Sequence, residues 1–213
     1  EPLSNLDAKM RATMRTEIIR IHQQLQTTFV YVTHDQTEAM TMGQRIVVMK
    51  DGLIQQVDTP DNLYTYPINQ FVGGFIGTPQ MNFINAMFEV EDKATYLTFS
   101  RYKIPLSRVI LKRLTIKDYN KRQVVLGIRP EDLLPKPFKD SQDRDNIIGD
   151  IRVYEKLGNE TLLYLHIEGL DNELVCRSGP RFAGSIGDKI SLAINSDFIQ
   201  LFDFDNGATL LKK

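Results

Sequence analysis

The side chains best suited to chemistry lie where an apolar run gives way to a helix-like pattern. Residues 30–33 (VYVT) are apolar or β-branched, and His34 and Asp35 follow them directly. In an open α/β sheet, ligands bind where the carboxyl ends of strands meet the amino ends of helices. His34 therefore either contacts a ligand or fills a corner of the fold. From the residue pattern alone, the structural interpretation is favoured.

A metal site at this junction is not predicted. His34, Asp35 and Glu38 do not make a closed zinc set, which needs four ligands. Asp35 and Glu38 also have the D-x-x-E spacing that satisfies free N–H groups at a helix start. The other two histidines, His22 and His166, are interpreted as structural.

Cys176 is the one cysteine of the chain and cannot form an internal disulfide, which fits a reducing cytoplasm. It lies in the alternating segment NELVCR, with no histidine close in sequence. We therefore predict a small buried side chain rather than a catalytic thiol.

The overall composition is that of an ordinary globular protein, with 42% hydrophobic and 25% charged residues and a net charge of −1. Nucleic acid is not expected as a partner, because domains that bind it are usually basic. No apolar stretch approaches the length needed to span a bilayer. The chain begins EPLSNLDAK, with neither a starting methionine nor a signal peptide, so we expect a processed chain or a fragment.

Helical periodicity dominates the first part of the chain. Residues 5–25 are predicted to form a helix, with Ser4 or Asn5 as N-cap and Asp7 near the positive end of the helix dipole. Its apolar stripe, at spacings of three and four, consists of Leu6, Met10, Met14, Ile18, Ile21 and Leu25.

A short buried strand is predicted at residues 28–33 and a second helix at 35–42. Asp51-Gly52 between two β-rich runs predicts a hairpin. Thr59-Pro60 predicts a helix start, and NQFVGGFIGTP a last short helix. One buried strand is too few for a parallel sheet, so the partner strands of this α/β segment are missing and its apolar surface should be exposed.

Short β-type runs replace the helical pattern after Pro79. They predict a small barrel or sandwich, with a polar loop at residues 136–146. The runs are FINAMFEV, ATYLTFS, QVVLGI, IIGDIRVYEKLG, ETLLYLHIEG, ELVCRS, KISLAI and FIQLFD.

Several segments of the sequence resemble a known protein family. EPLSNLDAKMR and FVYVTHDQTEAMTMGQRIVVMKDGLIQQVDTPDNLYTYPINQFVGGFIGTPQMNF are similar to the nucleotide-binding subunit of ABC importers for maltose and other sugars. LGIRPEDLL and EKLGNETLLY resemble its C-terminal TOBE regulatory domain, an OB-fold-like barrel. The resemblance implies an α/β remnant of a P-loop nucleotide-binding domain at residues 1–78, followed by an all-β TOBE domain at 79–213.

The resemblance also implies roles for single residues. Glu1 falls where the family has its catalytic glutamate, and His34 matches the switch histidine that contacts the γ-phosphate of ATP. Ser4, Asn5 and Asp7 match the D-loop, which crosses the dimer interface. Phosphoryl transfer asks mainly for positioning and charge stabilisation, which a carboxylate and an imidazole can supply.

The Walker A pattern, the Q-loop, the LSGGQ signature and most of Walker B do not occur in this sequence. The resemblance implies ATP and Mg²⁺ as cofactors of the full-length protein and none for this fragment, which we expect not to hydrolyse ATP. In the intact family these subunits form a homodimer through their nucleotide-binding and regulatory domains. They lie in the cytoplasm, on the inner face of the membrane, against the permease subunits of a sugar importer.

Two alternatives to the interpretation as an ABC importer subunit remain open. The chain could act as a non-catalytic regulatory or dimerisation module, with a regulatory protein or ligand on the TOBE domain. An OB-type nucleic-acid binder is disfavoured by the net charge. Within the barrel, Arg129 and Glu131 of GIRPE are interpreted as structural, with a regulatory surface as the alternative, and LGNET is predicted to be a hairpin turn.

Overall fold

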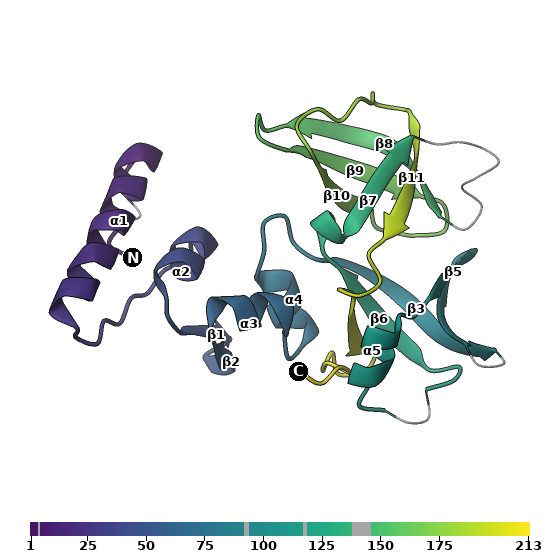
Figure 1. Cartoon of the computed structure of the whole chain (residues 1–213), viewed down its shortest axis with the longest axis horizontal. Helices are drawn as coiled ribbons and strands as arrows, with labels where there is room; N and C mark the ends of the chain where they lie inside the picture. The colour runs from purple at the N-terminus through teal and green to yellow at the C-terminus, as the bar shows by residue number, and fades with distance from the viewer. Residues whose placement is uncertain (4, 92–93, 117–118, 138–145) are drawn as a thin grey trace. The chain divides into compact units, whose positions relative to one another are not determined.

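The computed structural model describes residues 1–3, 5–91, 94–116, 119–137 and 146–213. The chain forms two compact units, residues 1–66 and 67–213, shown in Figure 1. The break between the units precedes helix α4 (Gln70–Phe75), because backbone bonds join its surroundings to the C-terminal segment, including Gln70 N–H to the Gly207 carbonyl at 2.8 Å. The boundary at 78/79, drawn for the family's domains, stays a prediction.

The first unit contains three helices and one hairpin. Its elements are α1 (Ala8–Leu25), α2 (Gln36–Met42), β1 (Ile46–Lys50), β2 (Leu53–Asp58) and α3 (Pro60–Thr65). The predicted hairpin is confirmed, with positive φ angles of 50° at Asp51 and 78° at Gly52 that suit a tight turn between antiparallel strands. Thr59 caps α3 and Pro60 begins it, as predicted.

The start of α1 differs from the prediction. Asp7 is the N-cap, and its carboxylate accepts a hydrogen bond from the Met10 N–H at 2.9 Å. Asn5 lies outside the helix, and Ser4 lies outside the described residues. Asp7 takes the capping role because its side chain stands three residues before the N–H that it accepts, which is the spacing a cap requires.

The strand predicted at residues 28–33 is wrong. This described segment has neither helix nor strand, and Val30 is 90% exposed and Val32 68% exposed. A strand is defined by the hydrogen bonds of a neighbour, and none of the described residues supplies one here. Helix α1 likewise buries none of its residues. The expected exposure of apolar surface is confirmed.

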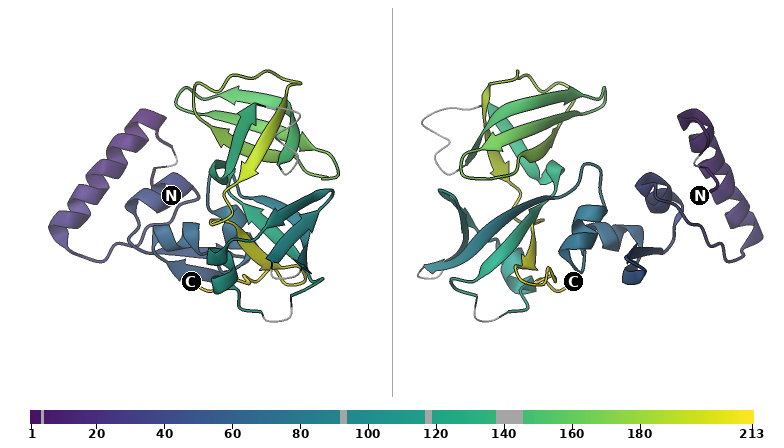
Figure 2. Two further views of the ribbon diagram at one scale, coloured as in Figure 1. Left: turned by 45° about the vertical axis from the view of Figure 1, so that its right-hand side comes forward. Right: turned by 180° about the vertical axis from the view of Figure 1, so that it is seen from behind.

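The second unit is built on two five-stranded sheets, seen from two further sides in Figure 2. One has the order β12-β6-β3-β4-β5 and the other β10-β9-β8-β11-β7, with antiparallel neighbours throughout. The strands are β3 (Asn82–Glu91), β4 (Ala94–Phe99), β5 (Tyr102–Pro105), β6 (Gln123–Ile128), β7 (Leu133–Pro137), β8 (Ile147–Lys156), β9 (Thr161–Ile167), β10 (Leu174–Ser178), β11 (Lys189–Ile194) and β12 (Gln200–Asp203).

All eight predicted β runs are strands, and the predicted LGNET turn joins β8 to β9. The polar loop placed at 136–146 lies largely outside the described residues, and its first two residues belong to β7. Sequence reasoning missed β5, β7, a 3₁₀ turn (Pro130–Asp132) and helix α5 (Arg108–Arg113). Strand β7 contains Pro135 and Pro137, and these prolines are tolerated because β7 lies at the edge of its sheet.

One apolar core joins the two sheets. It includes Phe88 and Leu97 from the first sheet and Leu163 and Leu165 from the second, none of them exposed to solvent. Burying such side chains is the main favourable contribution to the folding of this unit.

Helix α4 covers part of the outer face of the first sheet. It comes close because Gly73 and Gly74 have no side chains: a Cβ at Gly74 would lie 3.0 Å from the Phe83 ring, and one at Gly73 would lie 3.2 Å from the Phe202 ring. The small cluster of Met81, Phe83, Val125 and Phe202 lies in this region.

Candidate functional site

The start of helix α2 fixes the backbone around His34. Asp35 is the N-cap, and its Oδ1 accepts hydrogen bonds from the N–H groups of Thr37 at 2.7 Å and Glu38 at 3.2 Å. These bonds satisfy donors that a helix start leaves free. His34 is thereby held immediately before the positive end of the helix.

Glu38 does not return to the helix start, so only half of the predicted D-x-x-E arrangement forms. Glu38 is 4% exposed, and its carboxylate accepts hydrogen bonds from the Tyr31 hydroxyl at 2.9 Å and the Thr33 hydroxyl at 2.7 Å. The Asp35 N–H bonds instead to the Thr33 side chain at 2.9 Å. Burial, together with the Glu38 carboxylate, raises the pKa of Tyr31 to about 12.

Arg11 connects α1 to this junction. Its guanidinium lies 3.5 Å from the Asp35 carboxylate and donates to the Leu6 carbonyl at 3.1 Å. Burial opposes ionisation of Asp35, but the N–H groups of Glu38 and Thr37 and the charge of Arg11 outweigh it and lower the pKa of that carboxyl. The anionic form of Asp35, which the cap requires, is therefore favoured.

Glu1 and His34 lie in direct contact. The Nδ1 of His34 donates to the Glu1 Oε1 at 2.8 Å, and the side chain of His34 is 74% exposed and that of Glu1 46% exposed. This hydrogen bond lowers the pKa of the Glu1 carboxyl and, with the charge of Glu1, raises the pKa of His34. The structure thus brings together the two side chains to which the family resemblance assigns catalytic roles, and those roles stay predictions.

The junction encloses a small hollow of about 40 Å³, about enough for a water molecule. Its lining consists of Glu1, Arg11, Thr33, His34, Asp35 and Glu38. Sequence reasoning found Glu1, His34, Asp35 and Glu38 but missed Arg11, Thr33 and the partner Tyr31. Thr33 and Tyr31 were assigned to a strand, and nothing in the local pattern pairs Arg11 with a residue 24 positions away.

Of the three residues predicted to belong to a D-loop, the structure describes Asn5 and Asp7. Asp7 is engaged as the α1 cap, Asn5 is exposed at the preceding turn, and Ser4 lies outside the described residues. Their place at a dimer interface stays a prediction.

Arg129 is structural in the second unit, as predicted. It is 4% exposed, and its Nη1 donates to the carbonyls of Ile76 at 2.5 Å and Gly73 at 3.5 Å, at the C-terminal end of α4. Glu131 lies 4.0 Å from the Arg177 guanidinium.

Cys176 is fully buried, and its thiol donates to the Leu133 carbonyl at 3.1 Å. Burial raises the pKa of this thiol to about 12, which confirms its interpretation as a structural residue.

Within the described ranges, no three His, Cys, Asp or Glu side chains come together in a way that could hold a metal ion. In the same ranges no helix combines the length and the apolar character needed to cross a membrane.

Comparison with known proteins identifies the relatives of the chain. Residues 77–133 match the family described as the MalK OB fold domain. The oligosaccharides import ATP-binding protein MsmX of Bacillus subtilis is 44% identical over 204 residues, which are 95% of this chain and 54% of that protein. The chain is homologous to the ATP-binding proteins of sugar ABC importers. The resemblance inferred from the sequence motifs is thereby confirmed, as is an OB-type domain in the β-rich part.

Two further relatives agree with this family. The maltose/maltodextrin import ATP-binding protein MalK of Vibrio parahaemolyticus is 42% identical over 212 residues, covering 98% of this chain and 54% of that protein. The uncharacterized ABC transporter ATP-binding protein YurJ of Bacillus subtilis is 44% identical, covering 95% of this chain and 55% of that protein. The chain therefore spans about half the length of the relatives that it matches.

Proposed function

We propose that this chain belongs to an ATP-binding and ATP-hydrolysing subunit that energises carbohydrate import through an ABC transporter. The observation that carries the proposal is the contact of His34 Nδ1 with Glu1 Oε1 at 2.8 Å, just before the start of α2. The similarity to MsmX and MalK, whose names state import of oligosaccharides and maltose, supports the choice of a sugar as cargo.

The exposed ends of this pair fit a phosphate and an attacking water. Only the Nδ1 atom of His34 is engaged by the described residues, and the ring is 74% exposed, so its Nε2 is open to an anionic ligand. ATP, when bound, would supply the phosphoryl group and Mg²⁺ would neutralise part of its charge. Glu1 would orient water, and His34 would donate a hydrogen bond to a phosphate oxygen. On this chain we assign no residue to Mg²⁺.

The exposed apolar segment fits a remnant of a P-loop domain at residues 1–78. Phe29, Val30 and Val32 leave apolar surface open that neighbouring strands of a larger sheet would cover. In that setting Ser4, Asn5 and Asp7 would lie at a homodimer interface. The assembled subunits would bind the permease subunits at the cytoplasmic face of the membrane.

The deciding experiment measures ATP hydrolysis by the protein that the complete reading frame encodes, beside its His34→Ala variant. We expect the variant to lose most of its turnover while still binding ATP, because the proposed hydrogen bond of His34 to a phosphate oxygen acts on the transfer step. His22→Ala, a histidine on α1, is the matched control and should keep full turnover. Undiminished hydrolysis by His34→Ala would overturn the proposed role of this histidine.

A non-catalytic regulatory or dimerisation module is the second candidate, favoured by the core that the second unit has of its own. The same assay separates the two functions. If the complete protein dimerises without hydrolysing ATP, the module is the better description, and the catalytic proposal fails.

A further inference from the structure

The outer face of the first sheet of the second unit is hollowed beside the area that α4 covers. The hollow has a volume of about 270 Å³ and is lined by Asn85, Ala86, Met87, Thr98, Gln123 and Phe204. Three of these side chains form a row across adjacent strands, because Met87 pairs with Gln123 of β6 on one side and with Thr98 of β4 on the other. The row is therefore held by the backbone of three strands, so the base of the hollow is rigid.

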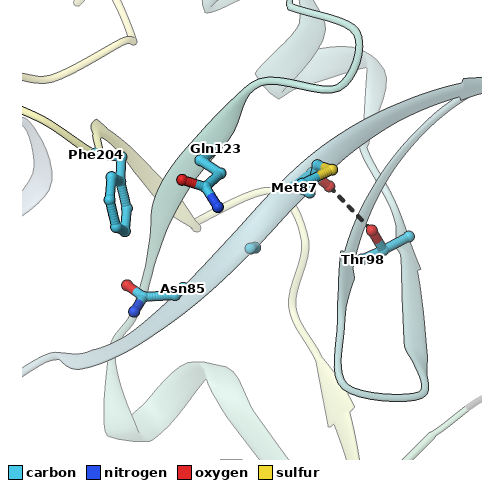
Figure 3. A pocket seen from close by; sticks show the side chains of 6 residues that line it. Asn85, Met87, Thr98, Gln123 and Phe204 are labelled. Atoms are coloured by element: carbon cyan, nitrogen blue, oxygen red, sulfur yellow. Dashed lines mark hydrogen bonds between the residues drawn. The ribbon is translucent and has the colours of Figure 1, made fainter.

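Two carboxamides in the hollow have no partner among the described residues. Asn85 and Gln123 lie near the Phe204 ring, as Figure 3 shows, while the Thr98 hydroxyl is already bonded to the Met87 carbonyl at 3.3 Å. Each free carboxamide offers two N–H donors and one acceptor oxygen. The hollow therefore presents two sets of hydrogen-bonding groups that a ligand could engage.

Apolar surface accompanies these polar groups in the lining of the hollow. Phe204 is 44% exposed and Met87 is 38% exposed, although both are large hydrophobic side chains. None of the residues that line the hollow is charged. Lys103, which pairs with Thr98 across neighbouring strands, already forms ion pairs with Glu89 and Glu91. A ligand that matches this surface is neutral, rich in hydroxyl groups and apolar on one face.

We propose that this hollow binds a neutral saccharide. Adjacent hydroxyls of a pyranose can each donate to and accept from a planar carboxamide, and the C–H face of the ring can lie against Phe204. A nucleotide fits less well, because the hollow supplies no cation for its phosphates. The site lies entirely within the second unit and does not depend on ATP hydrolysis, so it stands or falls separately from the proposed function.

The proposal is tested by NMR on the 213-residue chain, with maltotriose, raffinose and adenosine as probes. We expect saturation transfer from the protein to the C–H protons of at least one saccharide, and concentration-dependent shifts of the side-chain NH₂ signals of Asn85 and Gln123. Phe204→Ala and Gln123→Ala should each weaken binding by roughly tenfold or more. Phe198→Ala, which removes another exposed phenyl ring outside the hollow, should leave it unchanged.

Three outcomes would overturn the proposed saccharide site. The first is the absence of saturation transfer to both saccharides, and the second is equal saccharide affinity of the wild-type chain and Phe204→Ala. The third is transfer to adenosine alone, which would assign the hollow to a base rather than a sugar. Because Phe204 and Gln123 are surface residues, both variants should fold, and their amide spectra verify it. ATPase assays have no part in this test, so its failure would leave the proposed function untouched.

Discussion

The carboxamide of Asn82 pairs with the backbone of Val175 as a neighbouring strand would. Its Nδ2 donates to the Val175 carbonyl at 2.8 Å, and its Oδ1 accepts from the Val175 N–H at 2.7 Å. Asn82 begins β3 in one sheet, and Val175 lies in β10 at the edge of the other. One buried side chain thus satisfies an edge strand and fastens the two sheets together.

Asn82→Ala should therefore destabilise the second unit by about 3 kcal/mol, because it leaves the N–H and carbonyl of Val175 without partners in a partly buried position. Chemical denaturation of the chain gives the change in free energy of unfolding. Asn172→Ala removes an exposed carboxamide and should change it little. Equal stability of the two variants would show that the Asn82 bridge contributes nothing.

Arg129→Ala should loosen the end of α4. The buried guanidinium donates to the carbonyls of Ile76 and Gly73, and its loss should cost about 3 kcal/mol, since hydrogen bonds from charged groups are stronger than neutral ones. Faster hydrogen exchange of the Ile76 amide would locate the effect, because that N–H bonds within the helix to the Val72 carbonyl. Arg152→Ala, on an exposed arginine, is the control. Unchanged exchange at Ile76 would contradict the assignment.

The pKa of His34 should fall toward its ordinary value in Glu1→Gln, because the hydrogen bond and the negative charge of Glu1 hold it up. A raised pKa means that the contribution of His34 to stability is full at low pH and is lost as pH rises through that pKa. The pKa of Glu1 is lowered, so the contribution of Glu1 to stability is present at higher pH and is lost as pH falls through the pKa of its carboxyl. The pair is thus formed between the two titrations. NMR titration of the imidazole protons gives both midpoints, and an identical His34 midpoint in the variant would rule out the pair in solution.

Glu38→Gln should lower the pKa of Tyr31 from its value of about 12, because the carboxylate charge that disfavours a phenolate is removed. The raised pKa of Tyr31 contributes to the free energy of unfolding below pH about 10, and this contribution disappears as pH rises to about 12. Glu38→Gln should remove part of this contribution. The tyrosinate absorbance of each variant, minus that of its Tyr31→Phe derivative, isolates this one tyrosine. The prediction fails if the two difference curves coincide.

Local signals in the sequence predicted local structure well. Asp51-Gly52 predicted the hairpin, Thr59-Pro60 predicted the start of α3, and the alternating runs predicted eight strands. These predictions are confirmed because turns, helix starts and strand alternation depend on residues that are neighbours in sequence. The contact between Glu1 and His34 came from the family resemblance, since no short-range pattern joins residues 33 positions apart.

The failures have non-local causes. Residues 28–33 have the composition of a strand but lack a partner among the described residues, and a strand forms only when another backbone accepts its hydrogen bonds. Strand β7 was hidden by its prolines, which an edge position allows. The bonds from Tyr31 and Thr33 to Glu38 depend on a chain reversal that periodicity does not encode.

The burial of Cys176 makes the folded chain a convenient host for chemical labels. Its sulfhydryl is sealed in the core and only weakly acidic, so maleimide reagents should leave it untouched under native conditions. A second cysteine placed on the surface, such as Asn172→Cys, would then carry a fluorophore alone, with no need to remove the natural one. Reaction of Cys176 itself would signal that the apolar interior has opened, so the chain carries its own reporter of unfolding.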